Sequence, residues 1–310
     1  MRNNHKRETT NHKPIRAGEV AVVGRPNVGK STLVNALVGE KVAIVSNKPQ
    51  TTRKCILGVA RRPACEIALR DTPGIHRPQY RMNAAMVRDA QDALASADLV
   101  LFVVDASEAR GAGEEFILAR IAQAARPSVL ALNKIDRLRK DRLLPLIADF
   151  SRRHAFDAVV PVSARTGENV ERLFGVLADL LPEGEAAYPE DFLTTTPETE
   201  WIGEVIREKL LERTHDELPF AHAVLVESVR EGEQKDITVV TASIIVEREG
   251  EKGIVVGKGG AMIREIGRAA REELEGALGR RLFLDLTVRV KTDWRNDERF
   301  LAQLRGGGGN

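Results

Sequence analysis

The chain has 310 residues, a formal net charge of +2, 43% hydrophobic residues and 30% charged residues. This length is typical of about two domains, and the composition excludes a disordered chain because each domain can bury a core. The near-neutral balance excludes a polyanion-binding surface over the whole molecule, so any nucleic-acid surface must be local. The apolar runs stay well short of the ~20 residues of a membrane span. Cys55 and Cys65 predict buried free thiols of a reducing compartment, with a disulfide between neighbouring strands as the alternative.

Residues 1–16 carry five basic side chains against one acid, and we expect a flexible basic tail that could also touch RNA weakly. Beyond this tail, apolar runs alternate with amphipathic segments. Strands are predicted at 19–23, 56–60, 66–70, 99–104, 128–132 and 158–162, and helices at 30–38, 83–96, 112–124, 140–153 and 169–181. Such alternation predicts a doubly wound α/β domain over residues 17–182, with ligands at the carboxyl ends of its strands.

Residues 183–198 are rich in Pro, Thr and acids and predict a linker. A second, α+β domain is predicted over 199–305, in the order α-β-β-α-β-α. Its helices are expected at 199–214, from about 253 to 278 and at 294–304, and its strands at 221–230, 236–247 and 282–291. The glycine-rich residues 306–310 are expected to form a second flexible tail.

The first predicted strand runs directly into the segment G-R-P-N-V-G-K-S, Gly24–Ser31, and a helix begins there. This strand–GxxxxGK[ST]–helix arrangement is typical of a phosphate-binding P-loop. Backbone N–H groups and the helix N-terminus attract phosphate, Lys30 reaches the β- and γ-phosphates, and Ser31 can ligate Mg²⁺. The predicted nucleotide-binding residues of this loop are Gly24, Asn27, Val28, Gly29, Lys30, Ser31 and Thr32.

Two further segments predict the rest of the phosphate and metal site. D-T-P-G ends a predicted strand, so that Asp71 can hold Mg²⁺ and the Gly74 N–H can meet a γ-phosphate oxygen. Between this segment and the P-loop lies N-K-P-Q-T-T-R, residues 47–53, which resembles a first switch segment whose Thr ligates Mg²⁺. We favour Thr52 for this role, with Thr51 as the alternative. Lys30, Thr52 and Gly74 are the predicted catalytic residues.

The base of the nucleotide is predicted from N-K-I-D, which follows the strand at 128–132. Asp136 can accept hydrogen bonds from the guanine N1–H and N2–H₂, which adenine lacks, and this selects GTP over ATP. Asn133 is expected to brace the loops, and the stem of Lys134 to cover the base. Ser163 and Ala164 follow the next strand, and in GTPases the Ala N–H of this loop meets guanine O6.

Together these motifs resemble the translation-factor-like P-loop GTPases, and within them the Era family, over nearly the whole chain. Ras-like enzymes place a water-orienting Gln directly after D-x-x-G, whereas this chain has Ile75, which predicts slow hydrolysis; catalysis by His76 is the less favoured alternative. The resemblance also implies that Asn27 can bind a K⁺ ion that speeds hydrolysis. GTP or GDP with Mg²⁺ are therefore the expected cofactors, and K⁺ is a hypothesis.

In the second domain, G-K-G-G at Gly257–Gly260 is a G-x-x-G turn at the start of an amphipathic helix. Type II KH domains hold about four nucleotides with such a turn. Residues 252–305 carry 12 basic and 8 acidic side chains. Residues 200–251 carry 6 basic and 13 acidic side chains, and we interpret most of these acids as solvated. The predicted RNA-binding residues are Gly257, Lys258, Gly259, Gly260, Ile263 and Arg264. Ile266 could also floor the groove, and Trp294 either packs in the core or stacks on a base.

The resemblance implies a GTP-hydrolysing switch that binds the 3′ end of small-subunit (16S) ribosomal RNA and assists assembly of the 30S ribosomal subunit. It also implies a cytoplasmic protein, and peripheral membrane association stays open as an alternative location. We expect a monomer. The rival hypotheses are a passive RNA-binding assembly factor and a GTPase that partners tRNA modification. The second is disfavoured because the predicted GTPase domain comes first in this chain.

Overall fold

The computed structural model describes residues 14–48, 51–74, 81–108, 112–214, 222–233 and 236–304. Within these residues, the first domain contains a seven-stranded sheet with the strand order β2-β3-β1-β4-β5-β6, and β7 pairs with β1. Its strands are β1 (Ile15–Val23), β2 (Ile56–Arg62), β3 (Cys65–Asp71), β4 (Leu99–Asp105), β5 (Ser128–Asn133), β6 (Ala158–Pro161) and β7 (Glu183–Gly184). β2 and β7 run antiparallel to their neighbours, and the other pairs are parallel.

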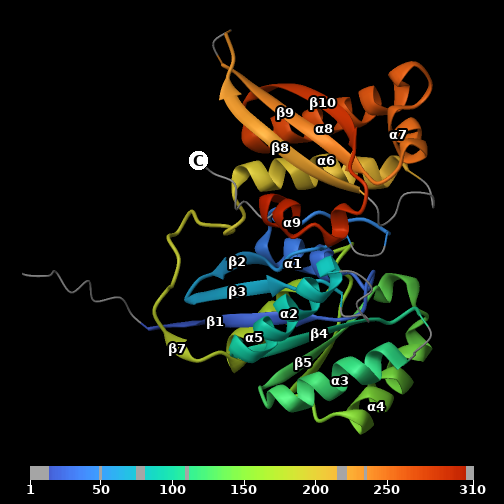
Figure 1. The fold of residues 1–310 in the computed structure, drawn as a ribbon. Coiled ribbons are helices and arrows are strands. Elements are labelled where there is room, and N and C mark those ends of the chain that lie inside the picture. The colour runs from blue at the N-terminus through green and yellow to red at the C-terminus, as the bar shows by residue number, and fades with distance from the viewer. Residues whose placement is uncertain are drawn as a thin grey trace, which may run out of the picture.

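Helices cover both faces of this sheet (Figure 1), as the alternating pattern predicts. They are α1 (Lys30–Val38), α2 (Arg81–Ser96), α3 (Ala112–Ala124), α4 (Leu143–Arg153) and α5 (Val170–Leu180). α1 and α5 bury Leu33 and Leu177 on one face, and α3 and α4 bury Ile117 and Phe150 on the other. Because both faces are covered, all seven residues of β4 are buried. The predicted doubly wound fold is confirmed.

The second domain contains a three-stranded sheet in the order β10-β9-β8, in which β10 runs parallel to β9 and β8 runs antiparallel to it. The strands are β8 (His222–Glu231), β9 (Ile237–Val246) and β10 (Arg281–Val290), and the helices are α6 (Glu198–Arg213), α7 (Glu249–Val256), α8 (Ala261–Leu278) and α9 (Glu298–Leu304). α6 and α8 pack on this sheet through a shared apolar core that contains Ile206 and Ile266.

One predicted helix of this domain is wrong. We expected a single helix from about residue 253 to 278, but the structure has two, separated by the turn at Gly257–Gly260. α7 begins earlier, at Glu249, where the Glu251 side chain accepts a hydrogen bond from the Arg248 N–H and caps the helix. Gly257 and Gly259 have φ angles of 69° and 59°, and this left-handed backbone ends α7 and re-aims the chain into α8.

The predicted linker is held against the first domain. β7 extends the sheet beside β1, Tyr188 and Phe192 stack on each other over β2, and Arg61 donates hydrogen bonds to three carbonyls of residues 189–192. The Val59 N–H donates to Leu193 O at 2.8 Å. Residues 183–184 therefore extend the sheet at β1, and residues 188–194 cover the β2 edge rather than spanning free space.

The ends of the predicted flexible tails also differ from the structure. β1 begins at Ile15, so residues 15 and 16 belong to the sheet, whereas residues 1–13 and 305–310 lie outside the described residues. Cys55 and Cys65 are free thiols. Within the described ranges, no helix has the length and apolar character that a membrane crossing requires.

Candidate functional site

The P-loop follows β1 and leads into α1, and close contacts at Gly24 and Gly29 leave no room for a side chain. A Cβ atom on Gly24 would lie 2.4 Å from the carbonyl oxygen of Val103 in β4. A Cβ atom on Gly29 would lie 2.4 Å from Nδ2 of Asn133, and Gly29 has a φ of 95°. Both positions therefore exclude any side chain, and the backbone of the loop stays free to approach a phosphate.

Lys30 is buried inside this loop, with 6% of its surface exposed. Its Nζ donates to Gly24 O at 3.2 Å and to Arg25 O at 3.0 Å. Burial lowers the pKa of Lys30 to about 8, although the charge of Asp71 opposes this shift. The loop thus holds a partly desolvated ammonium group whose charge a bound phosphate would stabilise.

Three oxygen ligands gather beside Lys30. Ser31 Oγ donates to Asp71 Oδ2 at 2.6 Å and lies 2.9 Å from Thr52 Oγ1. Burial raises the pKa of Asp71, and its Oδ1 is buried without a hydrogen-bond partner among the described residues. These hydroxyl and carboxylate oxygens, together with the unpartnered Asp71 Oδ1, suit Mg²⁺, which prefers hard oxygen ligands. Ser31, Thr52 and Asp71 therefore fit the predicted metal site.

The two threonine alternatives are separated by their contacts. Thr52 lies with Ser31 and Asp71, whereas the hydroxyl of Thr51 donates to Lys48 O at 2.6 Å. The backbone oxygen of Thr51 accepts a hydrogen bond from Arg207 of α6. The geometry therefore favours Thr52 as the switch ligand and gives Thr51 a contact with the second domain.

The residues predicted for guanine lie at the carboxyl ends of β5 and β6. Asn133 donates through Nδ2 to Val28 O at 2.9 Å and accepts from the Ala164 N–H at 3.0 Å, so it braces the two loops as predicted. Asp136 accepts from Ser163 Oγ at 2.7 Å and pairs with Arg165 at 3.1 Å. The Ser163 hydrogen bond lowers the pKa of Asp136, and this keeps the carboxylate charged to accept from a base.

Lys134 shows a function that the sequence analysis missed. Its Nζ donates to Asn27 O and pairs with Asp105 Oδ2, both at 2.6 Å. Burial opposes ionisation of Asp105, but hydrogen bonds from Lys134 and Ser107 hold its pKa below the usual value. Asp105 is the last residue of β4, so this ion pair holds Lys134 over the cleft. The sequence signal for this contact was an acidic residue at the end of a buried strand. Arg165, the partner of Asp136, was also missed.

These segments line one cleft of about 240 Å³. It is bounded by the P-loop, residues 44–47, the predicted metal ligand Thr52, Gly74 and the loops after β5 and β6, and Thr32 contributes to its wall. Asn27 donates to Asn47 O at 2.9 Å, which joins the P-loop to the first switch segment. A Cβ on Gly74 would lie 2.7 Å from Cγ of Pro26, so Gly74 lies against the P-loop. Gln50, Ile75 and His76 lie outside the described residues.

The G-x-x-G turn lies on the surface of the second domain, where Lys258 and Gly259 are exposed. A Cβ on Gly259 would meet nothing within 4 Å, although its positive φ still favours glycine. Arg264 is exposed one turn further along α8 and Ile263 is half-buried, so both can flank a nucleic-acid strand. The prediction that Ile266 floors the groove is wrong, because Ile266 is fully buried in the core. Trp294 is fully buried at the domain junction, which confirms core packing rather than stacking on a base.

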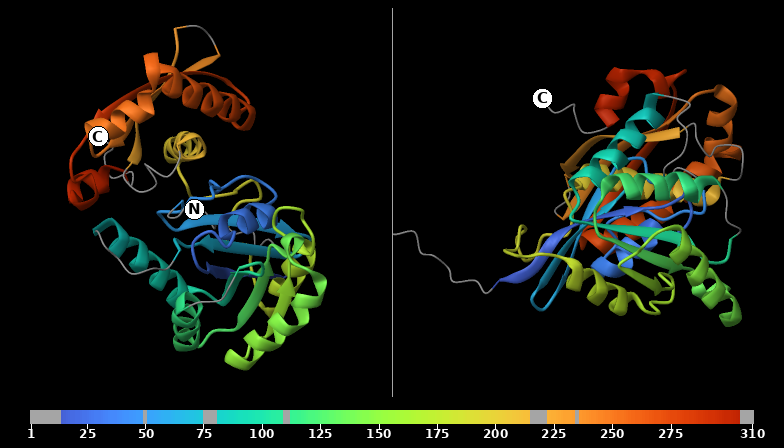
Figure 2. Two further views of the ribbon diagram at one scale, coloured as in Figure 1. Left: turned by 90° about the vertical axis from the view of Figure 1, so that its right-hand side faces the viewer. Right: turned by 90° about the horizontal axis from the view of Figure 1, so that it is seen from below.

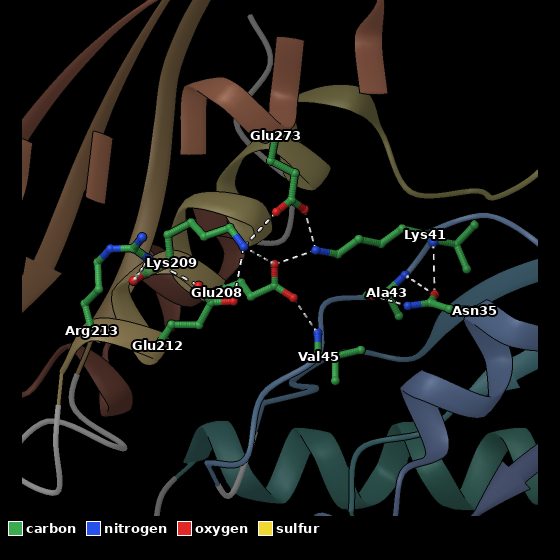
Figure 3. A network of polar contacts seen from close by, with 10 residues as sticks. Asn35, Lys41, Ala43, Val45, Glu208, Lys209, Glu212, Arg213 and Glu273 are labelled. Carbon is green, nitrogen blue, oxygen red and sulfur yellow. Dashed lines mark hydrogen bonds and ion pairs between the residues drawn. The ribbon is translucent and has the colours of Figure 1, made fainter. Parts of the chain in front are cut away.

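The two domains meet along α6, which lies between the three-stranded sheet and the P-loop domain (Figure 1). Glu208 of α6 is 2% exposed, pairs with Lys41 at 2.5 Å and accepts from the Val45 N–H at 2.8 Å. Lys41 also contacts Glu273 of α8, which in turn pairs with Lys209 at 2.7 Å (Figure 3). Glu208 belongs to the acidic residues 200–251, most of whose acids we interpreted as solvated, and that interpretation is wrong for Glu208.

The first switch segment is itself part of this junction. Arg53 donates through Nη1 to His222 O at 2.5 Å and lies 5.8 Å from the Trp294 ring centroid. Burial, together with the nearby Arg207, lowers the pKa of Arg53 to about 9. The start of α2 approaches α9 (Figure 2), and Met82 in its first turn packs in one cluster with Trp294. The segment that holds Thr52 and the first turn of α2 therefore both contact the second domain.

Comparison with known proteins agrees with this geometry. Residues 19–134 match a family model described as 50S ribosome-binding GTPase, and residues 221–295 match a KH domain model. A GTPase Era of Geobacter metallireducens is 45% identical over 94% of this chain and 98% of its own length. The chain belongs to the Era family of GTPases. An Era GTPase of Geotalea daltonii is also 45% identical, over 93% of this chain and 97% of its own length.

Solved Era structures resemble the chain over both domains. An Aquifex aeolicus Era variant bound to GDP·AlF₄⁻ is 39% identical, with a TM-score of 0.90 over 94% of this chain and 99% of its own. An Era in complex with MgGDPNP and nucleotides 1506–1542 of 16S ribosomal RNA is 39% identical, with a TM-score of 0.91 over 94% and 98% of the two chains. As an Era family member, the chain is a GTPase with a C-terminal KH domain.

Proposed function

We propose that this Era family GTPase is a switch that binds the 3′ end of 16S ribosomal RNA through its KH domain and assists assembly of the 30S subunit. One observation carries the proposal: the switch segment that holds Thr52 is hydrogen-bonded to the domain that presents the G-x-x-G turn. The Era relative in complex with MgGDPNP and a 16S RNA fragment supports the choice of RNA.

Hydrolysis uses groups that already converge in the cleft. Water attacks the γ-phosphorus, the bond to the β–γ bridging oxygen breaks, and GDP leaves with inorganic phosphate. The Lys30 ammonium offsets the negative charge on the β- and γ-phosphate oxygens, and the Gly74 N–H donates to a γ-phosphate oxygen. Ser31, Thr52 and Asp71 would hold Mg²⁺, which neutralises phosphate charge when bound. Asp136 selects guanine, and Ala164 offers its N–H to the base.

The RNA would lie along the turn and the start of α8. Glycines let phosphates approach the Gly257–Gly260 backbone, Lys258 and Arg264 add charge, and half-buried Ile263 offers apolar surface to a base. Gly260 and Arg264 lie close together, because a Cβ on Gly260 would be 3.2 Å from Nη1 of Arg264. This arrangement supports single-stranded RNA as the ligand, since unstacked bases can enter such a groove.

A change of the bound nucleotide would affect the RNA site through the contacts of the first switch segment with the KH domain, including α6. The Thr52 hydroxyl is the proposed Mg²⁺ ligand, and its neighbours Thr51 and Arg53 contact Arg207 and His222 of the KH domain. Loss of the γ-phosphate releases such a switch segment in GTPases. We therefore infer that hydrolysis loosens these contacts and changes how the KH domain is held. We further propose that the protein acts as a monomer in the cytoplasm, with membrane association limited to peripheral contact.

The decisive experiment replaces Lys258 and Gly259 with Asp in the full chain. We expect affinity for an oligonucleotide of the 16S RNA 3′ end to fall by at least tenfold, because two added negative charges oppose phosphate at the turn. GDP affinity should stay unchanged and serves as the control for folding. RNA affinity equal to that of the unaltered chain would contradict the RNA-binding assignment. A chain that binds RNA but never hydrolyses GTP would favour the passive assembly factor instead.

A further inference from the structure

A second cavity, of about 150 Å³, lies at the junction of the two domains and is separate from the nucleotide cleft. Its walls come from both domains: Ile44 and Ile56 from the first, and Trp201, Leu225 and Trp294 from the second. These walls are mainly apolar, and a cavity of roughly this volume can hold a benzene ring. Two arginines, Arg53 and Arg207, also line it.

Arg53 places an incompletely paired guanidinium group at this cavity. Nη1 donates to His222 O, but Nε and Nη2 are buried and have no hydrogen-bond partner in the part of the chain that the structure describes. The same Nε–Nη2 edge of other arginines holds a carboxylate. Arg70 binds Glu19 in this way at 2.7 and 2.9 Å, and Arg295 binds Glu247 at 2.9 and 2.6 Å. The Nε–Nη2 edge of Arg53 therefore lacks the anion that this fork normally takes.

The acids around the cavity are already committed to other cations. Glu204 accepts from Nε of Arg207 at 3.0 Å and from its Nη2 at 2.5 Å, and Glu200 pairs with Lys54 at 2.7 Å. Arg207 is only 2% exposed, and its Nη1 is also buried and unpartnered among the described residues. These five side chains carry three positive and two negative charges. A buried donor left unpaired is costly, so the site favours one added anion.

We propose that this interdomain cavity binds a small organic anion, a carboxylate or phosphate monoester with a compact apolar body. The acid group pairs with the guanidinium of Arg53, whose buried Nε and Nη2 atoms turn toward it on binding, and the apolar body packs against Trp201 and Leu225. Both domains contact the occupant, and Arg53 directly follows Thr52 in the chain. Occupancy therefore stabilises this arrangement of the two domains and slows the movement of the first switch segment.

The chain reports on this cavity by itself, because its two tryptophans, Trp201 and Trp294, both line the walls. The full chain, saturated with GDP and Mg²⁺ to occupy the nucleotide cleft, is titrated with benzoate, phenyl phosphate and neutral benzamide while tryptophan emission is recorded. We expect saturable changes with at least one anion and at least tenfold weaker binding of benzamide. The tighter anion identifies the preferred acid group. No saturable response to either anion, or equal binding of benzamide, would overturn the proposal.

The role of Arg53 is tested with Arg53→Gln, which removes the fork and the charge. We expect at least a tenfold loss of anion affinity, whereas Arg62→Gln, which removes an arginine paired with Glu171 away from the cavity, should change nothing. Arg53→Lys keeps the positive charge but lacks the two-donor fork, so its anion affinity should lie between those of the unaltered chain and Arg53→Gln. Anion binding that is unchanged in Arg53→Gln would contradict the assignment. The comparison of benzoate with benzamide uses the unaltered chain, so it decides the proposal even if a variant fails to fold.

Discussion

Guanine selection by Asp136 makes the sharpest mutational prediction. In Asp136→Asn, the carboxylate that accepts from guanine N1–H and N2–H₂ becomes an amide that turns one donor toward them. One hydrogen bond to a charged group is lost and the other is made to a neutral amide oxygen, which together cost roughly 2–4 kcal/mol, or about 30- to 1,000-fold in affinity. Xanthine carries an oxygen where guanine has the amino group, so the variant should bind xanthosine diphosphate better than the unaltered chain does.

The fold should survive this substitution. The amide oxygen of the substituted side chain can still accept from Ser163, whose Oγ lies 2.7 Å from Asp136 in the unaltered chain. The lost ion pair joins Arg165, whose side chain is 70% exposed, and such exposed pairs contribute under about 1 kcal/mol. The assay is equilibrium binding of labelled GDP and xanthosine diphosphate, with Arg165→Gln as the matched control that should keep guanine preference. Unchanged GDP affinity in Asp136→Asn would refute the assignment of the base site.

Three other predictions concern charge and ions. Because burial lowers the pKa of Lys30 to about 8 and bound phosphate raises it again, GDP affinity should fall as pH rises from 8 to 9, by up to about tenfold per unit. Equilibrium binding measures it, Lys30→Gln should lose this slope, and a flat profile in the unaltered chain would count against the assignment. If Asn27 helps to hold K⁺, GTP turnover should be severalfold faster in K⁺ than in Na⁺; equal turnover across a titration would end that hypothesis. Glu208→Gln should destabilise the chain by about 1–2 kcal/mol in urea unfolding, less than a fully buried pair, because Lys41 is partly exposed and keeps Glu273. In the double variant with Lys41→Met, the loss in unfolding free energy should be smaller than the sum of the two single losses. A sum that holds within ~0.3 kcal/mol would show that the two residues do not interact.

The sequence predicts the nucleotide site well because its determinants are local. Each motif follows a buried strand, and parallel strands bring their carboxyl ends to one edge of the sheet. The position of Asn133 after β5 was therefore enough to expect a brace between loops, and the structure shows its side chain joining Val28 and Ala164. The choice of Thr52 over Thr51 needed the structure, since adjacent residues point to different neighbours and spacing alone cannot separate them.

The junction between the domains could not be predicted in this way. Trp201 and Val205 showed one apolar face of α6, but Arg207 and Glu208 gave no sign that the opposite face is also buried. Their partners lie more than 150 positions away, at Thr51 and Val45. α7 was missed for a different reason: Glu249–Gly253 has no apolar period, and its start depends on capping by Glu251. The core packing of Trp294 was one of the two expected outcomes, but its cluster also contains Met82 and Met86 of α2 in the other domain, which no local pattern indicates.

The contacts of residues 51–53 with the KH domain should couple the nucleotide site to the RNA site. This coupling is measured by titrating an oligonucleotide of the 16S RNA 3′ end into the chain saturated with Mg²⁺ and either GDPNP or GDP. We predict that the two affinities differ by at least about fivefold, and that RNA changes the ratio of GDPNP to GDP affinity by the same factor. Equal RNA affinities in the two nucleotide states would contradict the coupling.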